Sequence, residues 1–179
     1  MSSFDSERST NEDYDSEIVE ERNPLISSIA NVLDHIIVNN KRFKSTVANQ
    51  LSFFSRQVPQ ISIEDYLDHI DFYSNCEDSS LIIALIYIDR ATSHGKIILN
   101  DNIIHRLLFT AVFVAIKYNE DQYYKIDYYA RTAGISVKEL LMLESEFVDL
   151  VEFDLYISNE EFTQYQTYLL KQRQEKLVN

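Results

Sequence analysis

Asp101 to Lys117 read DNIIHRLLFTAVFVAIK, a stretch without Gly or Pro whose charges lie near its two ends. From Leu107 to Ile116 it is apolar almost all round, and a helix of that kind is either buried or spans a membrane. The apolar run is much shorter than the roughly 20 residues that a span requires. We therefore predict a buried central helix, with Asn100 as its N-cap and Asp101 at the positive end of its dipole.

The composition indicates an all-α fold. The chain has 179 residues and 45% hydrophobic content, enough for one domain with extensions, and its two Gly and two Pro are too few for a turn-rich β fold. The net charge of −13 disfavours contact with nucleic acids and with anionic membranes. A single cysteine, Cys76, allows no disulfide within the chain, which favours a reducing compartment.

The order of apolar and polar segments predicts four regions. Residues 1–23 are polar and acidic and are expected to form a disordered tail, followed by a helical extension at 24–58. A box of five helices at 59–157 comes next, and a C-terminal helix at 158–179 ends the chain. In the box, Ser62 and Ser136 are candidate N-caps, and Gly134 has the place of a left-handed helix-ending residue. The pattern assigns no structure to the apolar residues between Val47 and Phe54.

No motif points to catalysis. Two glycines cannot build a phosphate-binding loop or a dinucleotide fingerprint, and no His-Glu-x-x-His occurs. The four histidines are scattered over separate predicted elements, and Cys76 has no histidine beside it in sequence. We therefore expect no metal, no cofactor and no small-molecule substrate, and a protein that is not an enzyme.

One carboxylate lies on the apolar face of a predicted helix. Glu144 has Leu140 and Leu141 one turn before it and Phe147 and Val148 one turn after it. A charge in such a place needs a partner, and Lys117 at the end of the central helix is the natural one. The pair has two interpretations: an internal ion pair that joins two helices, or a pair held at the surface to bind another protein.

Several short motifs occur in an order and spacing that resemble the cyclin family. They are Tyr-Ile-Asp-Arg (87–90), His-Arg-Leu-Leu (105–108), Ala-Ile-Lys-Tyr-Asn-Glu-Asp (115–121), and Glu144 followed by Phe-Asp-Leu (153–155). Further matches, among them Ile-Ser-Ile-x-x-Tyr-Leu (61–67) and Glu-Leu-x-x-Leu-Glu (139–144), resemble the phosphate-regulating P/U-type cyclins with a single cyclin box. The resemblance covers about 58–168 and implies a five-helix box around its third helix.

The resemblance also implies a function. Cyclins are non-catalytic subunits that bind and activate cyclin-dependent protein kinases in the nucleus or cytoplasm of eukaryotic cells, by packing on the kinase's C-helix. Lys117 and Glu144 match the family's Lys and Glu that hold the kinase. Matches to the family's apolar contact positions imply a floor of four side chains, Val114, Tyr118, Val148 and Phe153. Some P-type relatives replace activation-loop phosphorylation with an acidic residue near Glu120 and Asp121, and Asp121 is the candidate for that role; the alternative is an acidic, solvated loop.

Other functions remain open from sequence. The chain departs from mitotic cyclins at residues 59–62, Pro-Gln-Ile-Ser, where their substrate-recruiting apolar patch is not reproduced, and it has no second box. The alternatives are a DNA-associated transcription factor of similar fold, which the acidic charge disfavours, a helical enzyme or metal protein, and a scaffold or adaptor that binds no kinase.

Overall fold

The computed structural model describes residues 23–42, 52–93, 95 and 97–178, which form seven helices and contain no strand. The helices are α1 (Pro24–Asn40), α2 (Ile63–Ser74), α3 (Asp78–Ser93), α4 (Ile104–Asn119), α5 (Ile126–Thr132), α6 (Val137–Leu150) and α7 (Asn159–Val178). The all-α prediction is confirmed: α2 to α6 form the five-helix box, preceded by α1 and followed by α7. The predicted acidic tail lies outside the described residues except for Asn23.

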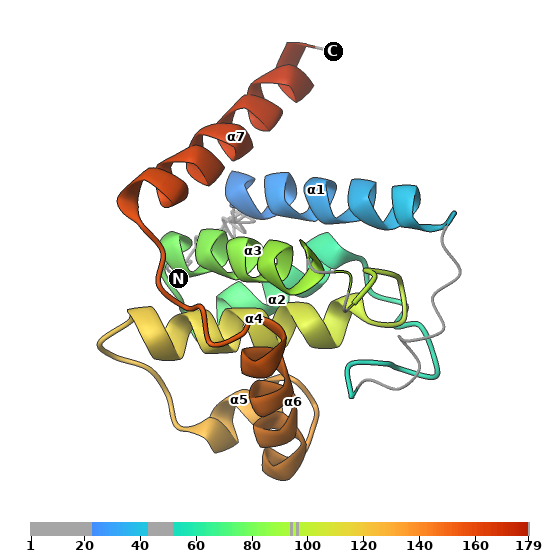
Figure 1. The fold of residues 1–179 in the computed structure, drawn as a ribbon, viewed down its shortest axis with the longest axis vertical. Helices are drawn as coiled ribbons and strands as arrows, with labels where there is room; N and C mark the ends of the chain where they lie inside the picture. The colour runs from blue at the N-terminus through green and yellow to red at the C-terminus, as the bar shows by residue number, and fades with distance from the viewer. Residues whose placement is uncertain (1–22, 43–51, 94, 96, 179) are drawn as a thin grey trace, which may run out of the picture.

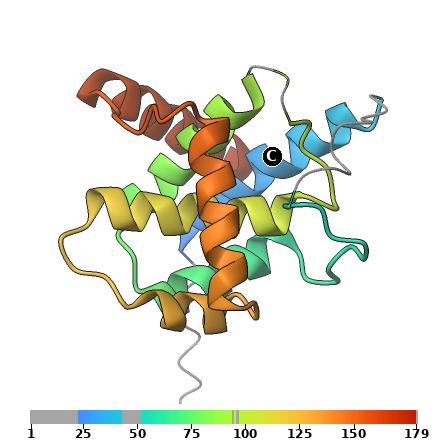
Figure 2. The same ribbon diagram turned by 60° about the horizontal axis from the view of Figure 1, so that its bottom comes forward.

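Helices α3 and α4 lie side by side at the centre (Figure 1). Every residue of α4 from Ile104 to Ile116 is buried except Arg106, which confirms the buried central helix. Figure 1 shows α1 and α7 on one side of this central pair and α5 and α6 on the other, while α2 packs against α1 and α4. Turned forward, α6 crosses α4 (Figure 2). The central helices α3 and α4 therefore separate a face formed by α1 and α7 from one formed by α5 and α6.

Side-chain caps begin several of the helices. The Ser62 hydroxyl accepts a hydrogen bond from Asp65 N at 3.0 Å, and that of Ser136 accepts one from Glu139 N at 3.1 Å, as the sequence predicted. Gly134 has a φ of 68°, the left-handed conformation predicted for it after α5. Local sequence thus sets where these helices begin and end.

The predicted start of the central helix is wrong. Asn100 does not cap α4: its Oδ1 accepts from Asn102 N at 3.0 Å, so residues 101–103 form a turn before the helix begins at Ile104. Asp101 consequently lies outside the first helical turn. An Asn side chain that bonds the backbone two residues on offers the chain an alternative to helix, and here that alternative prevails.

One further prediction needs correction. Leu141, expected in the core, is 50% exposed, because the buried stripe of α6 runs through Leu140, Leu143, Phe147 and Leu150 and leaves Leu141 beside it. The short helix α5 begins at Ile126, and Tyr123 before it is exposed. In the previously unassigned segment, the buried Phe53 packs edge-on against Phe147, with ring centroids 6.4 Å apart.

Candidate kinase-binding face

Lys117 and Glu144 meet where α4 and α6 cross. Lys117 lies in the last turn of α4, and its Nζ is 2.5 Å from Glu144 Oε1 in the middle of α6. The ammonium group also lies 5.2 Å from the centre of the Phe113 ring, within cation–π range. A cation near the C-terminus of α4 is further favoured by the helix dipole. The sequence prediction that these two residues pair is therefore correct.

The pair lies at the boundary between core and solvent. The Lys117 side chain is 36% exposed and that of Glu144 is 19% exposed. The buried side chains of Leu140, Leu143 and Phe147 bring α6 against α4 and hold Glu144 beside them. An ammonium group has three protons and a carboxylate two acceptor oxygens, so each group keeps bonding capacity after pairing. The pair joins two helices and can still bond to a group that arrives from outside.

The expected apolar floor is only partly at the surface. Tyr118 is 55% exposed and Phe153 is 71% exposed, whereas Val148 is partly buried. Val114 is 3% exposed and lies in the core, so its side chain supports the face from below and does not form part of it. Leu141, three residues before Glu144 and half exposed, is a surface residue that the sequence analysis had placed inside.

Phe153 is held on a left-handed turn after α6. Glu152 and Phe153 have φ values of 57° and 60°, and Phe153 N donates to Val148 O at 3.0 Å. Two non-glycine residues in this region are unfavourable unless surrounding contacts enforce the conformation. The enforcing contacts come from α3: Tyr87 Oη donates to Leu155 O at 2.8 Å, and the Arg90 guanidinium donates to Asp154 O at 2.6 Å and Tyr156 O at 3.0 Å. These hydrogen bonds therefore fix the turn that carries the exposed Phe153 ring.

Beyond Lys117, two adjacent acidic residues have different surroundings. The Glu120 carboxylate accepts from Glu77 N at 3.1 Å and from Ser80 Oγ at 2.6 Å, so it binds the N-terminal end of α3. Asp121 is exposed to solvent. Glu120 is therefore structural, while the Asp121 carboxylate is accessible to a second protein.

Comparison with known proteins agrees with this architecture. The family model described as Cyclin matches residues 5–155. The chain belongs to the cyclin family. It is 36% identical over 152 residues to cyclin-U4-1 of Arabidopsis thaliana, which is 83% of this chain and 75% of the relative. It is 33% identical to Arabidopsis cyclin-U3-1 over 84% of this chain and 70% of the relative, and 34% identical to rice cyclin-P3-1 over 67% and 51%.

Membership of the cyclin family implies a role in regulating cyclin-dependent kinases, and cyclins are in general non-catalytic. The resemblance to U-type and P-type cyclins inferred from sequence is thereby confirmed. In this cyclin we call the surface that carries Lys117, Glu144, Tyr118, Val148 and Phe153 the α4–α6 face; Val114 lies in the core and is not part of it. Leu141 adds to it.

Titratable side chains elsewhere in this cyclin have packing roles. His105 is buried, with Nε2 2.9 Å from Ile61 O, and His69 Nε2 lies 3.1 Å from Thr132 O. Burial raises the pKa of Tyr66, which packs against both histidines, to about 12. Among the described residues no three His, Cys, Asp or Glu side chains lie together as metal ligands would. None of the helices in the described part of the chain has the length and apolar character that a membrane span requires.

Proposed function

We propose that this cyclin forms a heterodimer with a cyclin-dependent protein kinase and activates it through the α4–α6 face. The observation that supports the proposal is the Lys117–Glu144 pair, which joins α4 to α6 and remains partly exposed, on a molecule whose Tyr118 and Phe153 rings are also exposed. Exposed aromatic side chains are enriched at protein interfaces and among their hot spots. This surface lies across the core from α1 and α7.

The pair can bind an incoming backbone. Lys117 and Glu144 bond each other through Nζ and Oε1. The remaining protons of Nζ can be donated to a carbonyl oxygen, and the second oxygen of Glu144 can accept from an amide N–H. Because the two groups are opposite in charge, they also fix the direction of a segment laid across them. Tyr118, Phe153 and Leu141 supply apolar area around this polar centre.

Activation in this proposal is positional. The cyclin packs on the kinase's C-helix and holds it inward, which completes the kinase's own Lys–Glu pair and orders its activation loop. The cyclin supplies no reacting group. Asp121, exposed just past α4, is the proposed contact to the activation loop, where a carboxylate would take the place of a phosphate.

The proposal assigns the protein to the nucleus or cytoplasm of a eukaryotic cell, where such kinases act. It includes no nucleic-acid or membrane partner, because a net charge of −13 repels polyanions. A scaffold or adaptor that uses the same fold without a kinase is the alternative, and the experiment below distinguishes the two.

The test is a pull-down from a lysate of the source organism with wild type, Glu144→Lys and a control, Asp34→Lys, each followed by an assay of histone kinase activity. Asp34 is exposed on α1, on the other side of the molecule, and its substitution makes the same change in charge. Kinase activity bound by wild type and Asp34→Lys but lost with Glu144→Lys supports the proposal. Equal activity with all three overturns the assigned face, and no activity with any of them favours the scaffold.

A further inference from the structure

A groove lies on the side of the molecule away from the α4–α6 face. Helices α1 and α7 diverge above α3 (Figure 1) and enclose a space of about 680 Å³. That volume is within the range of sites that bind drug-sized ligands or a few side chains of a peptide. No residue of α4 or α6 lines the groove, so it is distinct from the α4–α6 face.

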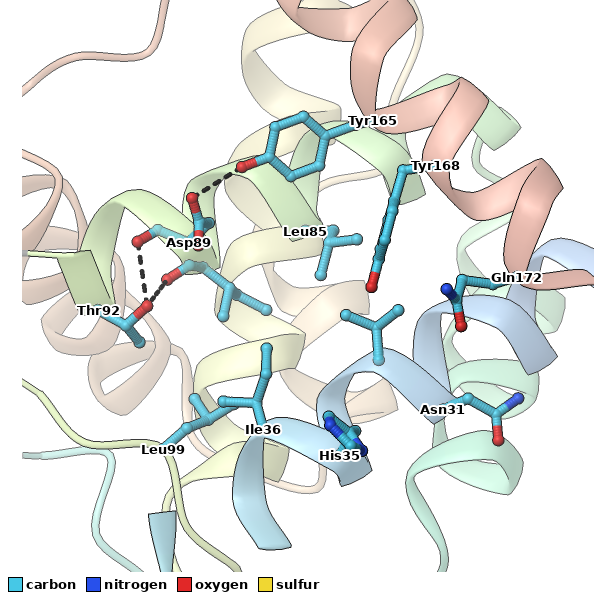
Figure 3. A pocket seen from close by; sticks show the side chains of 12 residues that line it. Asn31, His35, Ile36, Leu85, Asp89, Thr92, Leu99, Tyr165, Tyr168 and Gln172 are labelled. Carbon is cyan, nitrogen blue, oxygen red and sulfur yellow. Dashed lines mark hydrogen bonds between the residues drawn. The ribbon is translucent and has the colours of Figure 1, made fainter. Parts of the chain in front are cut away.

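The floor and walls of the groove are largely apolar. Buried Leu85 and Ile88 from α3 and Leu99 lie at the bottom, and α1 contributes the partly buried Val32 and Ile36. From α7, the rings of Tyr165 and Tyr168 face this floor, with His35 opposite Tyr168 (Figure 3). Tyr168 is 47% exposed, so much of a large aromatic surface in this groove is in contact with solvent.

One end of the groove carries a negative charge. Asp89 is exposed there, and its Oδ2 accepts a hydrogen bond from Tyr165 Oη at 2.7 Å (Figure 3). Among the described residues Asp89 forms no ion pair, and the adjacent Arg90 is paired with Glu161 at 2.7 Å and with Asp154 at 3.4 Å. Burial, Asp89 and Glu161 raise the pKa of Tyr165, which reflects the same negative surroundings. A carboxylate bonded to one tyrosine, in a groove that a second tyrosine also lines, favours a cation.

We propose that this groove binds a short segment of another protein in which a Lys or Arg lies next to an aliphatic or aromatic side chain. The basic group would pair with Asp89, and the apolar side chain would cover Leu85 and Ile88 beneath Tyr168. Charge complementarity selects this occupant: an overall charge of −13 attracts basic segments.

The same argument disfavours occupants from this chain itself. Residues 1–22 contain eight Asp and Glu and two Arg, and a second copy has the same acidic charge, so both are repelled from Asp89. Because no residue of α4 or α6 lines the groove, a segment bound there does not cover the Lys117–Glu144 pair. The inference does not depend on the proposed kinase partner.

The experiment is selection of peptides from a random 12-residue phage library on the full chain, with counter-selection on Asp89→Lys. Fluorescent versions of the selected peptides are then titrated with wild type, Asp89→Asn, Tyr168→Ala and Tyr118→Ala. Tyr118 is the matched control, an exposed tyrosine on the α4–α6 face. Melting curves recorded by circular dichroism confirm that each variant is folded.

We expect selected peptides to contain a Lys or Arg beside an apolar residue. Their affinity should fall at least tenfold in Asp89→Asn and in Tyr168→Ala, stay unchanged in Tyr118→Ala, and weaken at high salt. Peptides without a basic residue, equal affinity for wild type and both groove variants, or no peptide that distinguishes wild type from Asp89→Lys would each overturn the proposal.

Discussion

Lys117 and Glu144, 27 residues apart in sequence, form one ion pair at 2.5 Å across two helices, and both side chains remain in partial contact with solvent. This relationship separates an internal role from a binding role. An internal pair needs only that opposite charges face each other. A pair that binds a partner needs the positive charge at residue 117 and the negative charge at residue 144, because the partner's groups face each of them.

The first prediction exchanges the two charges. Lys117→Glu places two carboxylates together and should lower the free energy of unfolding by about 1 kcal/mol, since a partly exposed pair contributes little. The double variant Lys117→Glu/Glu144→Lys should recover stability in urea titrations. Kinase binding should remain absent in both, because the partner's groups meet reversed charges. Recovery of binding in the double variant would assign the pair a purely internal role.

The second prediction concerns the left-handed turn. Phe153→Gly should raise the free energy of unfolding by about 1 kcal/mol, because Gly adopts a φ of 60° without a steric penalty and the lost ring was 71% exposed. The same change should weaken kinase binding at least tenfold, about 1.4 kcal/mol, through loss of an anchor. Tyr156→Gly is the control: Tyr156 is equally exposed but has no positive φ, so stability should not rise. A stability gain without a loss of binding would remove Phe153 from the interface.

The third prediction tests the Arg90 hydrogen bonds that hold the left-handed turn at Glu152 and Phe153. Arg90→Lys keeps the charge but cannot bond Asp154 O, Tyr156 O and Glu161 together, because an ammonium group lacks the planar fork of a guanidinium. We expect a loss of about 2 kcal/mol in the free energy of unfolding, measured by urea titration. Arg131→Lys, whose side chain is 73% exposed, should change stability by less than about 0.5 kcal/mol. Equal effects would show that the Arg90 contacts contribute little.

Much of the fold follows from local sequence signals. The structure confirms three of these signals. The continuous apolar run forms the buried helix α4, serines cap the N-termini of α2 and α6, and a glycine with positive φ follows α5. Glu144 was identifiable because a charge inside an apolar stripe requires a nearby partner. These signals act over one or two helical turns, which is why they are readable without tertiary information.

Other features depend on contacts that are distant in sequence. Nothing local marks Phe153 as left-handed, since the conformation is enforced by Tyr87 and Arg90 more than sixty residues away. Leu141, expected on the apolar face, is exposed, and Val114, expected at the surface, is buried. The rotation of each helix about its axis is set by its whole buried stripe, which a single residue does not reveal. The groove likewise requires α1, α3 and α7 to be placed together before it exists.

The fourth prediction separates Glu120 from Asp121. Glu120→Ala should lower the free energy of unfolding by about 1 kcal/mol, as expected for a lost helix cap, because Glu77 N and Ser80 Oγ lose their acceptor. Asp121→Ala should leave thermal unfolding unchanged and lower the activity of a kinase partner whose activation loop is unphosphorylated. Unchanged kinase activity with Asp121→Ala would exclude the proposed activation-loop contact.

The last prediction uses Cys76, the single cysteine of the chain, as a reporter. Burial, together with the nearby carboxylates of Asp71 and Glu120, raises the pKa of its thiol. At pH 8 a free cysteine is roughly a quarter thiolate, whereas the native thiol should be almost fully protonated. Ellman's reagent should therefore react at least tenfold more slowly with the folded protein than with the protein in guanidinium chloride.

The same shift has a consequence for stability. A thiol whose pKa is higher in the folded state than in the unfolded chain holds its proton more tightly when folded. Below about pH 8.5 it is protonated in both states and stability does not change with pH; above that, the unfolded chain loses this proton first, so stability falls as pH rises. Wild type should therefore lose stability relative to Cys76→Ser as pH rises from 8 to 10, as measured by urea titration. Asp71→Asn, which removes one of the neighbouring charges, should reduce that difference and speed the reaction with Ellman's reagent. Equal reaction rates for folded and unfolded protein would show that Cys76 is neither buried nor affected by these carboxylates.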